Sequence, residues 1–167
     1  MSDSNVDAIA VRDEVSQWFF DRYLPAWVGV GNGTRDLDPD FILDYWGVPL
    51  HHCMPNASVW LLDAAAVVDF LKRRHRELRA RGYAYTAVPD RSIVVYHSHG
   101  AAIEVIWSRC RSTGSEIERL AVHFEAARAS DGWRIVGIQA APTSADTLRA
   151  AWPNGQKTLN RGSGVQS

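Results

Sequence analysis

Two adjacent histidines, His51 and His52, follow closely on a carboxylate and a phenol, Asp44 and Tyr45. An imidazole, a carboxylate and a phenol are groups that general acid–base catalysis uses. The histidines fall in a short strand-like run, and neighbouring strand residues point to opposite faces. At most one histidine therefore reaches a given substrate, and His52 with Asp44 and Tyr45 is the candidate catalytic set. A structural histidine without a catalytic task is the alternative interpretation.

A second carboxylate–imidazole pair depends on how the C-terminal strands align. The dipeptides His99-Gly100, Thr113-Gly114 and Asp131-Gly132 predict tight hairpin turns. Counting outward from these turns places Glu104 directly across from His123. A carboxylate beside an imidazole orients the ring and raises its basicity. The pair is either a catalytic group or a cross-strand ion pair on the outer face of the sheet, within a dimer interface.

The same count makes the opposite face of the sheet almost wholly apolar. This face should meet the helices and line a pocket for a small apolar molecule, together with aromatic side chains of the N-terminal helix. The candidate ligand-binding residues are Trp18, Tyr23, Trp27, Tyr96, Trp107, Phe124 and Gln139. As the one amide on that face, Gln139 either contacts the ligand or bonds a backbone group at the rim.

The sequence lacks the residue patterns that are typical of metal and cofactor sites. His97 and His99 have the alternate spacing of strand ligands, but a catalytic zinc site needs a third protein ligand that is not identifiable. Cys53 and Cys110 stand apart, with no CxxC spacing. No phosphate loop, G-x-G-x-x-G turn or serine elbow occurs. We therefore expect neither a metal nor a cofactor.

The N-terminal elements follow from hydrophobic periodicity. Apolar residues recur three and four apart over residues 11–27, which predicts an amphipathic helix. Pro25 should kink or end this helix near Leu24, and the glycine-containing run that follows should be a loop. Asp38-Pro39 should begin a short second helix, because it combines an N-cap residue with a proline at the first helical position.

A third helix should begin after Asp63 and end at Gly82, with its basic residues on a solvated outer face. A small hairpin precedes this helix, and β-branched and aromatic residues with period-two alternation follow it. Pro89 should break or bulge the first of the later strands. The expected strands span residues 48–53, 57–62, 83–98, 101–112, 115–130 and 133–141.

Composition limits the class of protein. A chain of 167 residues with 46% hydrophobic and 22% charged residues suits one domain, which we place at residues 8–152 between flexible segments at residues 1–7 and 153–167. The net charge of −1 gives no overall attraction to nucleic acid. No segment has the roughly 20 apolar residues of a membrane span, and the first residues do not read as a secretory signal. We expect a cytoplasmic protein.

The order of these elements, ending in Asp131-Gly132-Trp133-Arg134-Ile135-Val136, resembles the nuclear transport factor 2-like superfamily, particularly its SnoaL-like members. The resemblance covers about residues 8 to 145. It implies a cone-shaped α+β fold, in which three helices from the N-terminal half close a curled antiparallel sheet around a pocket. It also implies a homodimer through the sheet. Members include isomerases, dehydratases, cyclases and epoxide hydrolases, so the fold does not decide the function.

Three functions are consistent with these residues. The first is a cofactor-independent proton-transfer enzyme, such as an isomerase, dehydratase or hydrolase, acting on a small apolar substrate. The second is a non-catalytic domain that binds a hydrophobic ligand in the same pocket. The third is a dimeric interaction protein.

Overall fold

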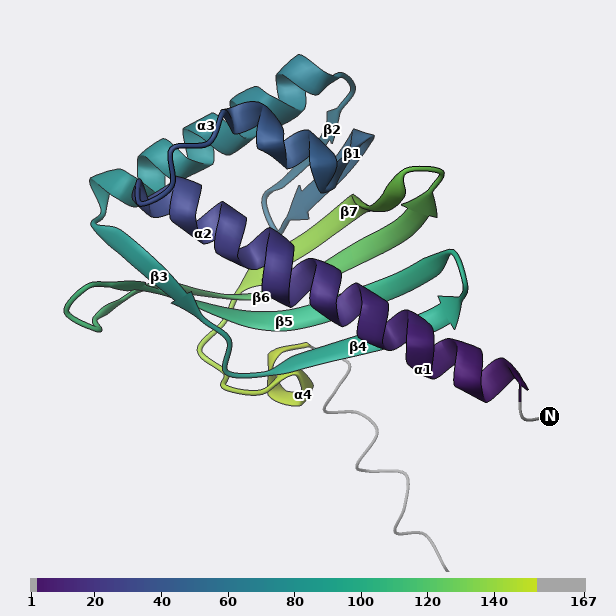
Figure 1. Cartoon of the computed structure of the whole chain (residues 1–167). Coiled ribbons are helices and arrows are strands. Elements are labelled where there is room, and N and C mark those ends of the chain that lie inside the picture. The colour runs from purple at the N-terminus through teal and green to yellow at the C-terminus, as the bar shows by residue number, and fades with distance from the viewer. Residues whose placement is uncertain (1–2, 153–167) are drawn as a thin grey trace, which may run out of the picture.

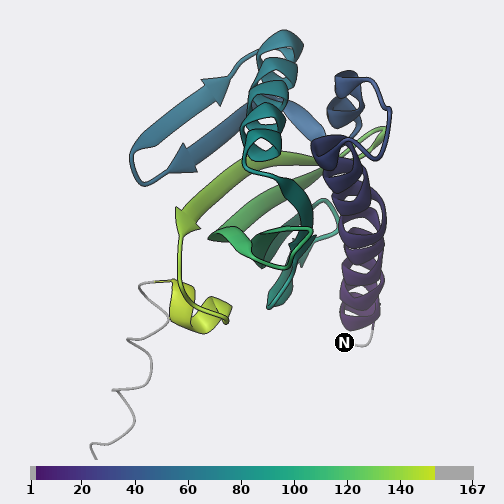
Figure 2. The ribbon, with the colours of Figure 1, turned by 90° about the vertical axis from the view of Figure 1, so that its left-hand side faces the viewer.

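The structure is a computed structural model that describes residues 3–152 (Figure 1). The helices of the N-terminal half lie on one side of a curled sheet, as the turned view in Figure 2 shows. This is the predicted α+β architecture, in which helices of the N-terminal half close the sheet. The segment expected to be flexible at the N-terminus already contains the start of a helix at Asp3. The expected tail at residues 153–167 lies outside the described residues.

One continuous helical rod forms the N-terminal part of the chain (Figure 1). Its three segments are α1 (Asp3–Ser16), the π-helical η1 (Gln17–Tyr23) and α2 (Leu24–Asn32). Of the two outcomes expected at Pro25, a kink or an end of the helix near Leu24, the end is wrong, because the helix continues to Asn32. The Leu24 N–H bonds the carbonyl of Phe19, five residues back, and Pro25 then occupies the first turn of α2, where a missing N–H is tolerated. The helix therefore continues to Gly33, whose φ of 79° ends it.

The second half of this rod packs closely on its neighbours. A Cβ at Gly31 would lie 3.1 Å from the ring of His75 and 3.2 Å from Tyr83, so the glycine allows α2 to approach α3 (Ala64–Ala80) and β3 (Tyr83–Ala87). The Arg79 side chain donates a hydrogen bond of 3.0 Å to the Gly31 carbonyl near the end of α2. Residues expected to form a loop thus become a helix that supports the third helix.

The other helices begin at side-chain caps. Asp38 accepts a hydrogen bond from the Asp40 N–H at 3.0 Å and starts the 3-10 helix η2 (Pro39–Asp44). Asp63 accepts from the Ala66 N–H at 2.8 Å and starts α3 (Ala64–Ala80). These two predictions are confirmed. A short fourth helix, α4 (Leu148–Ala151), was not predicted. No helix in residues 3–152 is long and apolar enough to cross a membrane.

Within residues 3–152, seven strands form one sheet in the order β2-β1-β7-β6-β5, with β3 and β4 both pairing with β5. All pairs are antiparallel except β1 with β7. The predicted break at Pro89 is confirmed, because the segment expected as one strand divides into β3 and β4. The strands are β1 (Trp46–Met54), β2 (Ala57–Leu61), β3 (Tyr83–Ala87), β4 (Arg91–His97), β5 (Gly100–Arg111), β6 (Glu116–Ala129) and β7 (Gly132–Pro142).

The core lies between the concave face of the sheet and the helical rod. Phe19 is fully buried at its centre, with its ring centroid 5.0 Å from that of Phe124 and 6.0 Å from that of Trp107. The register pairs Ile103 with Phe124 and Trp107 with Leu120 on this inner face. The apolar inner face of β5 and β6 is therefore as predicted.

Candidate functional site

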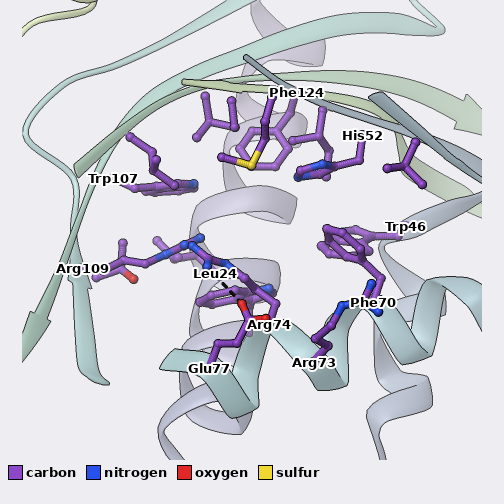
Figure 3. Close-up of a pocket in the computed structure, with 18 of the residues that line it drawn as sticks. Leu24, Trp46, His52, Phe70, Arg73, Arg74, Glu77, Trp107, Arg109 and Phe124 are labelled. Atoms are coloured by element: carbon purple, nitrogen blue, oxygen red, sulfur yellow. Dashed lines mark ion pairs between the residues drawn. The ribbon is translucent and has the colours of Figure 1, made fainter. Parts of the chain in front are cut away.

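A cavity of about 240 Å³ lies between the inner face of the sheet and α3 (Figure 3). Its walls are mainly aromatic and aliphatic, as small-molecule sites usually are. Besides Leu24, Ala57, Val59, Thr86 and Ile138, the lining residues are Tyr23, Trp27, Trp46, His52, Met54, Phe70, Arg73, Arg74, Glu77, Trp107, Arg109, Leu120, Val122, Phe124 and Ala140.

The hydroxyl of Tyr23 has a hydrogen-bond partner inside the protein. Its hydroxyl accepts a hydrogen bond of 3.2 Å from the indole N–H of Trp46. Burial raises the pKa of Tyr23 well above its ordinary value, so the hydroxyl stays protonated. Tyr23 therefore shapes the cavity and is a poor source of protons near neutral pH.

His52 is the imidazole that faces the cavity, with its ring centroid 4.7 Å from that of Phe70. Burial, and next the positive charge of Arg74, lowers the pKa of His52 from 6.5 to about 4. At neutral pH the ring is consequently uncharged. His51 lies on the other face of β1, where its Nε2 is 2.8 Å from the Ser58 hydroxyl and its ring stacks on Trp60. Strand alternation thus separates the two histidines.

The other members of the expected catalytic set lie outside the cavity lining. Asp44 is exposed at the end of η2. Tyr45 is half-buried and packs its ring against the core, with its centroid 6.2 Å from that of Trp18 and 5.5 Å from that of Tyr23. The structure therefore does not bring Asp44 and Tyr45 together with His52 around one ligand.

The expected ligand-binding residues divide into three groups. Tyr23, Trp27, Trp107 and Phe124 line the cavity, whereas Trp18 is buried in the core beside it. The remaining two, Tyr96 and Gln139, lie on the outer face of the sheet, and this part of the expected inner face is wrong.

Register shifts within the strands explain the misplaced residues. The β4–β5 loop is Ser98-His99, because His97 pairs with Gly100, and this earlier loop alone would keep Tyr96 on the inner face. A register shift between Val95 and His97 pairs Val95 with Ala101 and turns Tyr96 outward, where it is 62% exposed. The β6–β7 strands start one residue early as well and contain a bulge after Glu125. Gln139 consequently pairs with His123, and Ile138 takes the inner position.

Three arginines at the cavity were not proposed as site residues. Arg73 was expected on the solvated face of the third helix and Arg74 was not considered, yet both line the cavity. Counting outward from the Thr113-Gly114 turn also predicts Arg109 across from Glu118, and this register is confirmed. The signal for Arg74 was its spacing of four residues from Phe70, which puts the two side chains on one stripe of the helix.

Arg109 is the most buried charge of the site, at 8% exposed. Its guanidinium donates to Glu118 at 2.5 Å and lies 4.8 Å from the ring centroid of Trp27. Arg74 also contacts Glu118, and Arg81 pairs with its second oxygen at 2.9 Å. Burial raises the pKa of Glu118, but the three cations outweigh that effect, so the net shift is downward and the carboxylate stays ionised.

The second predicted pair, Glu104 and His123, forms on the outer face of the sheet. The register is as expected, and His123 Nδ1 lies 3.1 Å from Glu104 Oε1. The other oxygen of Glu104 accepts from the Trp152 indole at 3.2 Å. Helix α4 also covers this region, since Leu148 packs on the outer side of β5. The pair therefore lies away from the cavity.

A second hollow, lined by His51, Trp60, His123 and Gln139 among others, lies on the same outer face. Within residues 3–152, no group of three histidine, cysteine or carboxylate side chains is placed to hold a metal ion. The turn histidines His97 and His99 thus lack a third ligand in the described part of the chain.

Solved structures with a similar fold indicate the class of protein. An NTF2-like protein with a cystatin-like fold from Novosphingobium aromaticivorans is 18% identical, with a TM-score of 0.58 over 84% of this chain and 87% of that one. A protein of unknown function from Pectobacterium atrosepticum is 19% identical, with a TM-score of 0.57 over 81% and 92%. A putative ketosteroid isomerase from Parabacteroides distasonis is 10% identical, with a TM-score of 0.50 over 65% and 78%.

The particular family follows from the sequence. The model of the family described as NTF2-like protein (DUF6841) matches residues 13–143, and the chain belongs to this family. No curated protein sequence matches the chain. The NTF2-like resemblance and the fold class are confirmed, and similarities at these identities extend to the fold alone.

Proposed function

We propose that the inner cavity binds a small, largely apolar molecule. The observation that carries this proposal is the lining itself, in which aromatic rings from the helical rod, β1, α3, β5 and β6 converge on one enclosed space. At roughly 20 to 30 Å³ per non-hydrogen atom, judged from the volume of liquid water, a cavity of about 240 Å³ holds about ten such atoms. A ligand with one or two rings fits this size.

Binding is testable with a neutral probe, 2-naphthamide. Trp27, Trp46 and Trp107 line the cavity, so a bound aromatic ligand should change the tryptophan fluorescence to saturation. The variant Ala140→Phe fills the cavity and should abolish the change. Ala129→Phe, at an exposed position of β6, makes the same substitution outside the cavity and should leave binding intact. Equal binding by all three proteins, each shown to be folded by circular dichroism, would remove the proposal.

A second candidate function, proton transfer within the same cavity, is favoured by His52. The ring faces an apolar space and is uncharged at neutral pH, and no hydrogen bond to it occurs within residues 3–152. A free imidazole nitrogen in this position can accept a proton from a bound carbon acid. A pKa of about 4 makes the base weak, so we rank this function below binding.

Solvent deuterium exchange into the acidic CH₂ group of 2-tetralone, followed by NMR, measures such proton transfer. His52→Ala should slow the protein-catalysed exchange by about 10²-fold, the effect of losing a general base. His51→Ala is the matched control, because His51 faces away from the cavity. The exchange rate should be constant above pH 5 and fall as the pH drops below 4. Equal rates in both variants would exclude His52 as the base.

A further inference from the structure

Positive charge exceeds negative charge around the otherwise apolar cavity. Its lining contains three arginines, Arg73, Arg74 and Arg109, and one carboxylate, Glu77. Behind the lining, Glu118 is shared by Arg74, Arg109 and a further arginine, Arg81. Four guanidinium groups thus face two carboxylates, which leaves two positive charges without a partner of their own. A charge held beside an apolar space is costly unless it finds a counter-charge.

Arg109 carries the strongest part of the argument. It is 8% exposed, and its Nε has no hydrogen-bond partner within the described residues although the atom is fully buried. Buried polar groups are nearly always hydrogen-bonded, so a guanidinium of the cavity lining that keeps an unpartnered donor has unused capacity to bind an acceptor. In Figure 3 the Arg109 guanidinium reaches from β5 toward Arg74 on α3, below Trp107.

The remaining arginines connect this buried donor with the surface. Arg74 is half-buried beside Glu118, and Arg73 is exposed, with its guanidinium 5.7 Å from the ring centroid of Phe70. No ion pair of Arg73 occurs within residues 3–152. Exposed Ala57 and Val59 of β2 also line the cavity near its opening. Positive charge therefore runs from the opening to the interior, an arrangement that attracts anions.

We propose that the cavity selects an apolar molecule that carries one carboxylate, with its rings against Trp107 and Phe124 and its carboxylate on Arg109 and Arg74. This inference rests on the proposed binding function and names its ligand class. A guanidinium presents its N–H groups in a planar fork that matches a carboxylate. Stacking on Trp27 fixes the orientation of the Arg109 fork before any ligand binds.

Two probes of nearly the same shape test this selection, 2-naphthoate and its neutral analogue 2-naphthamide. Tryptophan fluorescence measures the two dissociation constants, and their ratio gives the preference for the acid. We expect this preference to be about tenfold or more at low salt, the scale of a hydrogen bond to a charged group. The ratio of the two constants cancels any general change in cavity shape. Added salt should lower the ratio, because it screens the arginine near the opening.

Arg109→Met should bring the ratio close to one while Glu118 keeps Arg74 and Arg81 as partners. If this variant does not fold, Arg74→Gln on the half-exposed side of α3 should also lower the ratio. Arg76→Gln is the matched control, since Arg76 is exposed on the same helix and does not line the cavity.

Each outcome has a distinct meaning. Equal binding of acid and amide by the wild-type protein would overturn the carboxylate inference and leave the binding function standing. Binding of neither probe would overturn both. A preference for 2-naphthoate that persists in Arg109→Met and Arg74→Gln would show that the charge is recognised elsewhere, which also overturns the inference.

Discussion

His75 on α3 is a buried histidine that the folded protein keeps uncharged. It is 4% exposed, its ring lies edge-on to Trp27 at 4.5 Å, and its Nε2 has no partner within the described residues. Burial, and then the charges of Arg79 and Arg109, lowers its pKa from 6.5 to about 4. Between these values the unfolded chain binds a proton that the folded chain does not. The stability contributed by neutral His75 is therefore complete above pH 6.5 and is lost as the pH falls toward 4.

At about 1.4 kcal/mol per pKa unit, this loss amounts to about 3 kcal/mol of the free energy of unfolding. His75→Phe keeps an aromatic ring against Trp27 and removes the titrating nitrogen. Urea unfolding at pH 7.0 and 4.5, followed by circular dichroism, should show a pH-dependent loss smaller by about 2 to 3 kcal/mol in the variant than in the wild type.

The control, Leu71→Met, changes another buried residue of α3 without removing a titrating group. It should lower stability by less than about 1.5 kcal/mol at both pH values alike. A His75→Phe protein with the wild-type dependence on pH would refute the reasoning, because the lost stability would then come from other groups.

Three further outcomes follow from the ion pairs and caps. Glu118→Gln should cost about 3 kcal/mol of unfolding free energy, because it leaves a buried arginine uncompensated, whereas Arg81→Gln, at the exposed edge of the cluster, should cost less than about 1 kcal/mol. Asp63→Ala should lower the free energy of unfolding, measured by urea unfolding, by about 1 kcal/mol, the contribution of an N-cap; an unchanged free energy would show that the Asp63 cap does not stabilise α3. If the chain forms the expected homodimer through the outer face of the sheet, Glu104→Ala should lower its sedimentation coefficient; monomers in both proteins would contradict that assembly.

The ends of helices and strands were predicted well where one residue type determines the local backbone conformation. The Asp63 side chain accepts a hydrogen bond in the first turn of α3, and Pro89 cannot donate to a ladder, so β3 and β4 separate there. Pro25 was interpreted by the same logic but with the opposite outcome. A π-helical segment places the proline in a first helical turn, and single-residue rules contain no information about that rearrangement.

Register was predictable only as far as the turns were. The strands on either side of Thr113-Gly114 align as expected, so Glu104 and His123 meet. At the other two hairpins the loop begins one residue earlier than the glycine dipeptide indicates. Each of these hairpins also contains a register shift, between Val95 and His97 and between Glu125 and Ala126. A shift of one residue exchanges the two faces of a strand, which moved Tyr96 and Gln139 out of the site.

The arginines of the cavity show a different limit of sequence reasoning. Charged residues on a helix were assigned to solvent because most such residues are exposed. Long side chains can nevertheless lie along apolar surface with the charged end at a cavity edge, as Arg73 does over Phe70. Whether they do so depends on what packs beside the helix, and only the placement of β1 and β2 next to α3 decides it.

The arginines connect the two functions proposed for the cavity. The positive charges of Arg74 and Arg109 contribute to the lowered pKa of His52, although burial is the larger cause. A carboxylate bound on these arginines offsets part of their field, so binding should raise the pKa of His52 while burial still holds it below its usual value. The base then becomes stronger in the complex than in the free protein, which is the direction that proton abstraction near neutral pH requires. An anionic substrate would therefore activate His52 as it binds, whereas a neutral molecule of the same shape would leave the histidine a weak base.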